Sequence, residues 1–280
     1  MTNESMRFGF ILPGGSATEQ LRQAVLAERA GWDGVFVWEV AYGVDAWGLL
    51  SAMAASTSRI RLGTMLTPLP WRRPWKLASQ VATLDDLSGG RAVVGLGLGA
   101  LDPVLPTGSG EVTDRRQRAA MLDEGIDLLR ELWRGGRSYA GEHYQFDAGT
   151  GGLGSGGLRP VQQPIPIWAV GAWPRPKSMA RILRCDGVIP EYHRGDGQEA
   201  LPDDQRELIA WLAERGRTDL DVVHEGETPA DDRAAAIAKV TPWAEAGATW
   251  WLESRWGGDQ HREKKMHEVM KRLEAGPPRV

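Results

Sequence analysis

The sequence predicts an α/β fold in which eight parallel strands alternate with eight helices and close into a (β/α)8 barrel. Short continuous apolar runs, typical of strands buried on both faces, alternate with segments of helical periodicity along the 280 residues. Eight such units in about 270 residues fit a closed barrel better than an open doubly wound sheet. We expect a single domain over residues 1–280, with its active site at the carboxyl ends of the strands.

The first unit illustrates the pattern. Residues 7–12 form an apolar run that Pro13 ends, Thr18 is a candidate N-cap, and Gly31 ends the helix that follows. The same alternation predicts the remaining elements in order: strand 34–38, helix 46–56, strand 60–66, helix 75–87, strand 92–98, helix 115–134, strand 165–170, helix 175–184, strand 187–190, helix 203–216, strand 220–224, helix 231–247, strand 249–252 and helix 259–274.

One stretch departs from the alternation. Residues 138–166 are rich in glycine and proline and show little periodicity, and the glycine run 149–157 has the composition of a flexible segment. We therefore expect a short insertion at about 138–164, after the fourth helix.

Composition excludes several classes of protein. The 33 basic and 37 acidic residues give a net charge of −4, so nothing draws the chain to nucleic acid or to anionic membranes. The single cysteine, Cys185, excludes a disulfide framework and a multi-thiolate metal site. No apolar run is long enough for a membrane span or an export signal, so we expect a soluble, cytoplasmic protein.

Glycine, aromatic and carboxylate residues follow the predicted strands, without the clustering of metal ligands that hydrolytic barrels show. The glycines of 95–99 match a dinucleotide fingerprint by letters, but Pro103 and Pro106 follow where a helix should start. Residues 170–173 end the next predicted strand with small side chains. In both places the small residues either pack a crowded strand end or expose backbone N–H groups to a phosphate.

The order of motifs resembles the bacterial luciferase-like flavin-dependent oxidoreductases. The likeness covers residues 7–190 well and is thin after about residue 195. Its most specific stretch is Leu87-Ser-Gly-Gly-Arg91 followed by Gly95-Leu-Gly-Leu-Gly99. The other matching segments are 30–38, 54–63, 74–85, 123–133, 141–144, 159–161, 165–168 and 186–188.

This resemblance implies a barrel that binds FMN or, in a sister group, the deazaflavin coenzyme, with the ring over the strand ends. It also implies a ring-supporting bulge with a cis peptide nearest Met65-Leu66 and a phosphate near residues 171–173. Since no metal ligands cluster at the strand ends, we expect no metal site. The residues that the resemblance places at the cofactor are Trp38, Thr64, Met65, Leu66, Gly97, Gly99, Val170, Gly171, Ala172 and Trp173.

One departure from the family concerns catalysis. Members commonly carry a histidine just after the acidic residue that ends the second strand, whereas this chain has Trp38-Glu39-Val40-Ala41. Glu39 is then a candidate proton donor or base, or else a carboxylate that bonds backbone or substrate. His193 is a second catalytic candidate, and His224 also lies at a predicted strand end.

The resulting hypothesis is a monooxygenase that uses reduced FMN and dioxygen on a small organic substrate. The alternatives are a deazaflavin-dependent hydride-transfer oxidoreductase and a non-catalytic flavin-binding barrel. A separate flavin reductase and a second copy of the chain are the expected partners. We expect the homodimer contact on the face of helices 46–56 and 75–87, with Trp47, Leu50, Met53 and Trp75.

Tryptophan is unusually frequent, with 13 against 4 phenylalanines and 4 tyrosines, and it supplies flat apolar surface. Trp32 and Trp133 are predicted to pack helices on the barrel. Those expected at the mouth, as walls of a pocket for a flat ring, are Trp38, Trp71, Trp173, Trp251 and Trp256.

Overall fold

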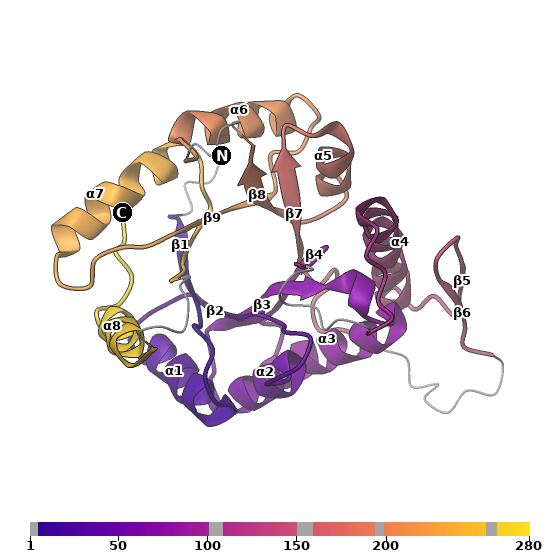
Figure 1. The fold of residues 1–280 in the computed structure, drawn as a ribbon, viewed down its shortest axis with the longest axis horizontal. Coiled ribbons are helices and arrows are strands. Elements are labelled where there is room, and N and C mark those ends of the chain that lie inside the picture. The colour runs from indigo at the N-terminus through magenta and orange to yellow at the C-terminus, as the bar shows by residue number, and fades with distance from the viewer. Residues whose placement is uncertain (1–4, 101–108, 150–158, 194–198, 256–261) are drawn as a thin grey trace.

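Eight parallel strands close into a barrel surrounded by helices (Figure 1), so the predicted fold class is confirmed. The computed structural model describes residues 5–100, 109–149, 159–193, 199–255 and 262–280, the first four residues of the last helix by backbone alone. The barrel strands, in spatial order, are β1 (Arg7–Ile11), β10 (Trp250–Glu253), β9 (Asp221–Gly226), β8 (Gly187–Tyr192), β7 (Ile167–Trp173), β4 (Ala92–Gly97), β3 (Arg61–Pro68) and β2 (Gly34–Val37).

A helix follows each barrel strand, and η1 (Leu69–Trp71) adds a short 3-10 turn after β3. The α-helices are α1 (Ala17–Arg29), α2 (Ala46–Ser56), α3 (Pro74–Ser88), α4 (Arg115–Trp133), α5 (Pro176–Ile182), α6 (Pro202–Ala213), α7 (Arg233–Glu245) and α8 (Arg262–Glu274). Among the described residues, none of these helices is both long and apolar enough to cross a membrane.

The N-cap of the first helix lies two residues before the expected one. Ser16, not Thr18, is the N-cap: its hydroxyl accepts the Glu19 N–H at 3.2 Å, and the Glu19 carboxylate accepts the Ser16 N–H at 2.8 Å. The sequence Ser-Ala-Thr-Glu offers this reciprocal pair only at Ser16, because the capping box needs the acidic residue three positions on.

Large aromatic side chains fill the barrel interior. Phe36, Trp168 and Trp250 come from three strands, and the Phe36 and Trp168 rings stack with centroids 5.2 Å apart. Trp32 and Trp133 are buried between helices and barrel, as predicted. Trp251 was expected at the mouth, and this is wrong: because successive strand residues face opposite sides, it points outward while Trp250 points inward.

The insertion contains a small hairpin of β5 (Ser138–Ala140) and β6 (Gln145–Asp147), beside α4 in Figure 1. The Phe146 ring stacks on Trp75 of α3 with centroids 5.8 Å apart. Glu124 of α4 accepts the backbone N–H groups of His143 and Tyr144 at 2.8 and 2.6 Å. The hairpin is thereby fixed to two helices, and the glycine-rich run after residue 149 lies outside the described residues.

The side chains expected to form a dimer contact are turned inward. Trp47, Leu50 and Met53 are buried in the core of the protomer, and Trp75 is occupied by Phe146. The prediction of this surface is wrong, because the apolar face of α2 packs on α3 and the barrel rather than facing outward. The homodimer stays a prediction without an assigned face.

Candidate functional site: the carboxyl end of the barrel

A backbone irregularity interrupts β3 at the mouth of the barrel. Thr64 pairs with Val94 of β4, the pairing resumes only at Thr67, and the Met65-Leu66 peptide between them is cis. The Thr64 hydroxyl donates to the Gly95 carbonyl at 3.1 Å, and the Thr67 hydroxyl donates to Thr64 Oγ1 at 3.1 Å. The expected bulge and its cis bond are confirmed, and their role in supporting a ring stays a prediction.

The glycines of β4 make room for this bulge. A Cβ on Gly95 would lie 2.2 Å from the Thr64 carbonyl oxygen, and one on Gly97 would lie 2.6 Å from the Leu66 side chain. Gly99 adopts φ +76°, a conformation that favours glycine, and its free face abuts Pro68. Close packing thus explains why glycine occupies these positions. A role for Gly97 and Gly99 in phosphate binding remains a prediction.

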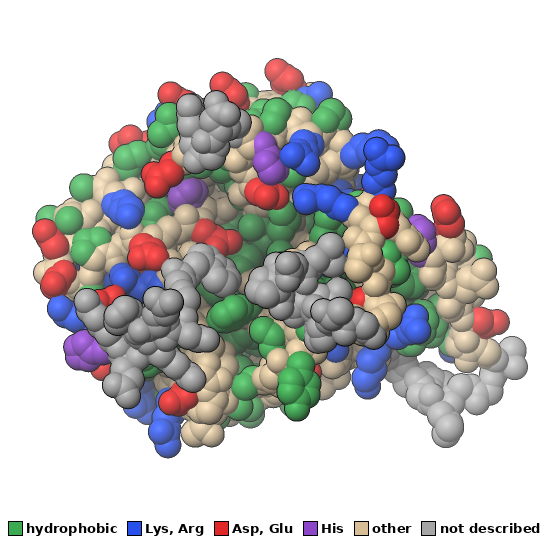
Figure 2. Space-filling view, viewed as in Figure 1, with side chains coloured by type: hydrophobic (Ala, Val, Ile, Leu, Met, Phe, Trp, Pro, Cys, Tyr) green, Lys and Arg blue, Asp and Glu red, His purple; other side chains and the backbone are tan. Residues whose placement is uncertain are grey.

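Apolar side chains form the floor of the mouth. Met65 and Val170 belong to the cluster that fills the barrel, and Leu66 lies over Gly97. Trp38 stands at the rim, 38% exposed, with its indole N–H donating to the Leu12 carbonyl at 2.8 Å. Figure 2 shows the hollowed centre lined by hydrophobic side chains, with acidic and basic side chains around it. Such a floor suits a flat ring better than a metal ion or a charged group.

Glu39 is held in place rather than presented to open solvent. Its side chain is 5% exposed, one carboxylate oxygen pairs with Arg72, and the other accepts the Trp47 indole N–H at 3.3 Å. Burial lowers the pKa of the Arg72 guanidinium from its ordinary value, yet an arginine stays charged. Glu39 and Arg72 line a hollow of about 360 Å³, which also contacts Trp71 and Asp45.

The end of β7 reaches further than the sequence indicates, because Gly171, Ala172 and Trp173 continue the strand. Gly171 faces outward, where a Cβ would lie 2.9 Å from Val188. The Ala172 N–H donates to Ser178 Oγ at 2.9 Å, and the Trp173 ring meets Trp211 edge-on. The Ala172 N–H is therefore already taken, and an anion here would meet the Ser178 hydroxyl instead.

The two strand-end histidines differ in their surroundings. His193 lies at the rim with its side chain 32% exposed and its Nε2 3.6 Å from the Glu191 carboxylate. His224 points outward and stacks on Trp243 with ring centroids 3.4 Å apart, and burial lowers its pKa to about 3. Although His224 follows a predicted strand, as His193 does, it does not face the mouth, since the alternation of β9 turns it into the helix layer.

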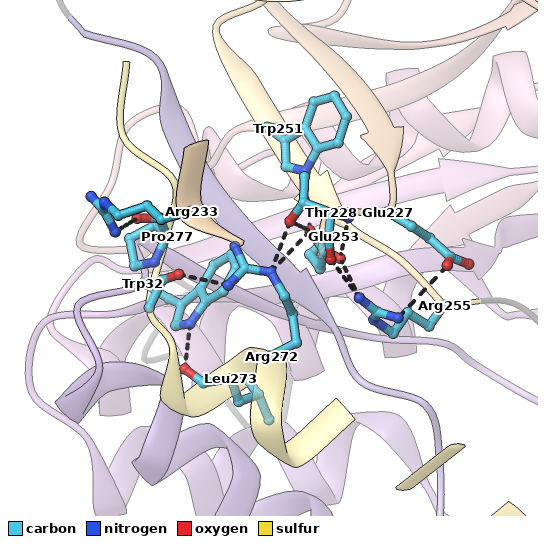
Figure 3. A network of polar contacts seen from close by, with 11 residues as sticks. Trp32, Glu227, Thr228, Arg233, Trp251, Glu253, Arg255, Arg272, Leu273 and Pro277 are labelled. Atoms are coloured by element: carbon cyan, nitrogen blue, oxygen red, sulfur yellow. Dashed lines mark hydrogen bonds and ion pairs between the residues drawn. The ribbon is translucent and has the colours of Figure 1, made fainter. Parts of the chain in front are cut away.

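A buried ionic network lies at the end of β10 (Figure 3). Glu253 ends β10 fully buried, accepts the Thr228 N–H and hydroxyl at 2.8 and 2.7 Å, and pairs with Arg255 at 3.4 Å and with Arg272 of α8 at 3.7 Å. The Arg272 guanidinium also lies over the Trp32 ring, 5.1 Å from its centroid. These residues join the last strand, the loop after β9 and the last helix.

Several residues at this end were not predicted. Arg118 of α4 is buried and donates to the Leu98 and Gly99 carbonyls, beneath the Trp71 ring. Helical periodicity could not predict this burial, because it assigns apolar residues to the buried face of a helix and charged residues to the exposed face. Trp71 does line the hollow beside Glu39 and Trp173 packs at the strand end, whereas Trp256 lies outside the described residues.

Comparison with known proteins agrees with this geometry. The family described as luciferase-like monooxygenase matches residues 6–277. A protein of Mycobacterium tuberculosis, provisionally named a coenzyme F420-dependent oxidoreductase, is 34% identical over 236 residues, 78% of this chain and 64% of its own length. The chain therefore spans just under two thirds of that relative. An F420-dependent glucose-6-phosphate dehydrogenase of Nakamurella multipartita is 31% identical over 262 residues, 87% of this chain and 74% of its own.

Two solved structures share the fold. An F420-dependent secondary alcohol dehydrogenase in complex with an F420-acetone adduct superposes with a TM-score of 0.75, at 17% identity, over 98% of this chain and 99% of its own. The oxygenating constituent of a Baeyer-Villiger monooxygenase from Pseudomonas putida, in complex with FMN, superposes with a TM-score of 0.70, at 16% identity, over 97% of both chains.

Proposed function

The chain belongs to the luciferase-like monooxygenase family of enzymes, and we propose that within it the protein is an F420-dependent oxidoreductase that transfers a hydride to or from a small organic substrate. The observation that carries the proposal is the 31% identity to an F420-dependent dehydrogenase across 87% of this chain. The FMN-binding monooxygenase shares the fold at only 16% identity, which supports the architecture but not its oxygen chemistry.

The residues at the mouth fit a flat heterocycle with an anionic tail. Leu66 lies inward because Gly97 leaves space for it, and together with Val170 it offers an apolar surface. Ser178 accepts the Ala172 N–H, which leaves its hydroxyl proton available to an anion, and Arg175 and Lys177 are exposed in the same turn. A deazaflavin bound there would supply the hydride chemistry at its ring.

The chain's own part is to bind, orient and exclude water. The floor of Met65, Leu66 and Val170 would hold the ring, and Trp38, fixed by the Leu12 carbonyl, would wall the substrate space. Glu39 fixes Arg72 at the rim, where the guanidinium faces the hollow of about 360 Å³. Glu191 of β8 and His193, directly after it, lie across the barrel from β2 and would be candidate proton donors or acceptors for a reacting hydroxyl or carbonyl.

The monooxygenase hypothesis is less well supported than its deazaflavin alternative. The curated relatives quoted above are named for F420, and both are at least 31% identical to this chain. The absence of a histidine after Glu39 is the observation that favours a non-catalytic flavin-binding barrel. Turnover with any substrate would exclude that alternative.

Cofactor preference tests the proposal. The purified protein is titrated with F420 and with FMN while tryptophan fluorescence is followed, since Trp38 stands at the rim. We expect F420 to bind at least about tenfold more tightly than FMN, a difference of about 1.4 kcal/mol. Tighter binding of FMN would contradict the proposal and return the monooxygenase hypothesis to first place.

A further inference from the structure

We propose that the substrate is a neutral alcohol or ketone with an aromatic or alicyclic body, and that the mouth rejects phosphorylated and carboxylated compounds. The inference rests on the proposed function and names a substrate class for it. The site is the hollow of about 360 Å³ beside Glu39 and Arg72, near the lower end of the range of about 300 to 1,000 Å³ typical of small-molecule sites.

This hollow adjoins the apolar floor of the mouth. The Glu39 N–H donates to the Leu66 carbonyl at 3.4 Å, so the loop that follows β2 starts against the bulge of β3. A Cβ on Gly99 would lie 3.1 Å from the Trp71 ring, two residues along the chain from Gly97, over which Leu66 lies. A ring on the floor and a molecule in the hollow would therefore be neighbours, as hydride transfer between them requires.

The walls of the hollow are largely apolar or aromatic. The side chains of this kind that line it are Val40, Ala41, Tyr42, Val44, Ala46 and Trp71. Tyr42 is 93% exposed, so packing its ring against a bound apolar body would remove apolar surface from water. These walls favour a substrate with an apolar, ring-shaped body.

Trp71 adds one hydrogen-bond donor to the walls. Its indole N–H is buried and has no acceptor in the part of the chain that the structure describes. The Arg118 guanidinium, 5.9 Å from the ring centroid, helps to hold the ring in place. A buried N–H group without an acceptor is costly, and the oxygen of an alcohol or ketone would satisfy it. The donor thus asks for one neutral acceptor on an otherwise apolar body.

The charges in the lining are already compensated within the protein. The Glu39 carboxylate pairs with Arg72 and accepts the Trp47 indole N–H. Asp45 accepts the Gly48 N–H at 2.6 Å as the N-cap of α2, where the helix dipole favours a negative charge. Arg72, whose charge Glu39 already balances, is the one cation among the described lining residues.

The third carboxylate of the lining, Glu111, faces the buried Arg118. Burial and the charge of Arg115 lower the pKa of the Arg118 guanidinium, and the charge of Glu111 opposes this effect. An anionic substrate would therefore find no uncompensated cation among the described lining residues, and the nearby carboxylates would repel it. A neutral substrate requires no such partner, so the hollow selects it by excluding charge.

Ligand-observed NMR on the full chain, with and without F420, tests this selection through binding alone. The probes are acetophenone, cyclohexanone, benzoate and glucose 6-phosphate. Benzoate matches acetophenone in size but carries a charge, and the Nakamurella multipartita relative is named for glucose 6-phosphate. We expect saturable binding of both ketones, and at least about tenfold weaker binding of the two anions.

Variants locate the binding. Trp71→Phe keeps an aromatic ring but removes the donor, and should weaken ketone binding about tenfold. The exposed variant Tyr42→Ala should weaken it several-fold. Leu87→Ala, which removes an exposed apolar side chain at the opposite end of the barrel, is the matched control and should bind like the wild type. Glu39→Gln removes the counter-charge of Arg72, so benzoate should bind at least about tenfold more tightly than to the wild type.

Four outcomes would overturn the inference. They are wild-type binding of either anion as tight as that of the ketones, no ketone binding with or without F420, unchanged ketone affinity in both Trp71→Phe and Tyr42→Ala, and no gain of benzoate binding in Glu39→Gln. Circular dichroism melts confirm that each variant is folded. Tighter binding of FMN than of F420 would overturn the proposed function instead, and the measurements made without cofactor do not depend on it.

Discussion

Glu39 follows β2, and the histidine that similar proteins commonly carry just after this position is absent here. The two carboxylate oxygens of Glu39 are held by Arg72 and by the Trp47 indole. A group bound on both oxygens is better suited to position a neighbour than to carry a proton. We therefore assign Glu39 the positioning of Arg72 at the rim of the mouth, and leave proton transfer to the His193 side of the barrel.

A double-mutant cycle tests this assignment. Glu39→Gln and Arg72→Gln should each lower kcat/KM by about tenfold, and the double variant should lose little more, because each single change already breaks the same ion pair. The shape of the pH profile should stay that of the wild type. Additive losses, or a titrating limb that vanishes only in Glu39→Gln, would show Glu39 acting as an acid or base.

His224 should make stability depend on pH. Burial lowers its pKa to about 3, below the value of about 6.5 in the unfolded chain, so between these values only the unfolded state binds the proton. The wild type should lose up to about 1.4 kcal/mol of unfolding free energy per pH unit as the pH falls through this window. Denaturant melts of His224→Gln should show a shallower slope, and equal slopes would contradict the account.

Side-chain direction limited what the sequence could predict for single residues. The strands were located to within a few residues at their ends, but Trp251 and His224 point into the helix layer and Trp250 into the barrel. In a continuous apolar run nothing marks which alternate residue faces inward, because both faces of a parallel sheet are buried. Glu39 likewise could not be matched to Arg72, which lies on another loop.

At the scale of the elements, β3 and β4 form a matched pair. Gly95→Ala would place a methyl group 2.2 Å from a backbone oxygen of the bulge, whereas Gly97→Ala would meet the movable end of Leu66 at 2.6 Å. Gly95→Ala should therefore cost about 2 kcal/mol or more of unfolding free energy, and Gly97→Ala clearly less.

The two variants should separate fold from function. Gly97→Ala should weaken cofactor binding through the displaced Leu66 while its thermal melt stays close to that of the wild type. If both variants destabilise equally, or if Gly97→Ala leaves binding unchanged, Leu66 is not part of the cofactor floor.

The periodicity of the sequence correctly predicted the order and type of the barrel elements. The observed ends of these elements differ from the predicted ends by a few residues. β7 runs to Trp173 rather than Val170, and α6 ends at Ala213 rather than at residue 216. The bulge at Met65-Leu66 leaves no mark in the hydrophobic pattern and was expected only through the family resemblance. The β5–β6 hairpin inside the insertion was not predicted at all, because its strands of three residues each are too short for periodicity to show.

Across the whole molecule, the Glu253 network ties the last helix to the barrel. Glu253→Gln keeps the shape but leaves Arg272 and Arg255 without their buried counter-charge, which should cost about 3 kcal/mol of unfolding free energy. Lys271→Ala, which removes an exposed ion pair of the same helix, is the control and should have a much smaller effect. Equal denaturant midpoints for the two variants would contradict a structural role for the network.

The central claim is that the mouth of this barrel serves hydride transfer with F420. One measurement tests it most directly: a single panel of alcohols, aldehydes and ketones is offered with F420 in the absence of oxygen, and with reduced FMN in its presence. We predict that the visible absorbance of F420 changes with at least one substrate class, without any need for oxygen. Oxygen-dependent product formation with FMN, and no reaction with F420, would contradict the claim.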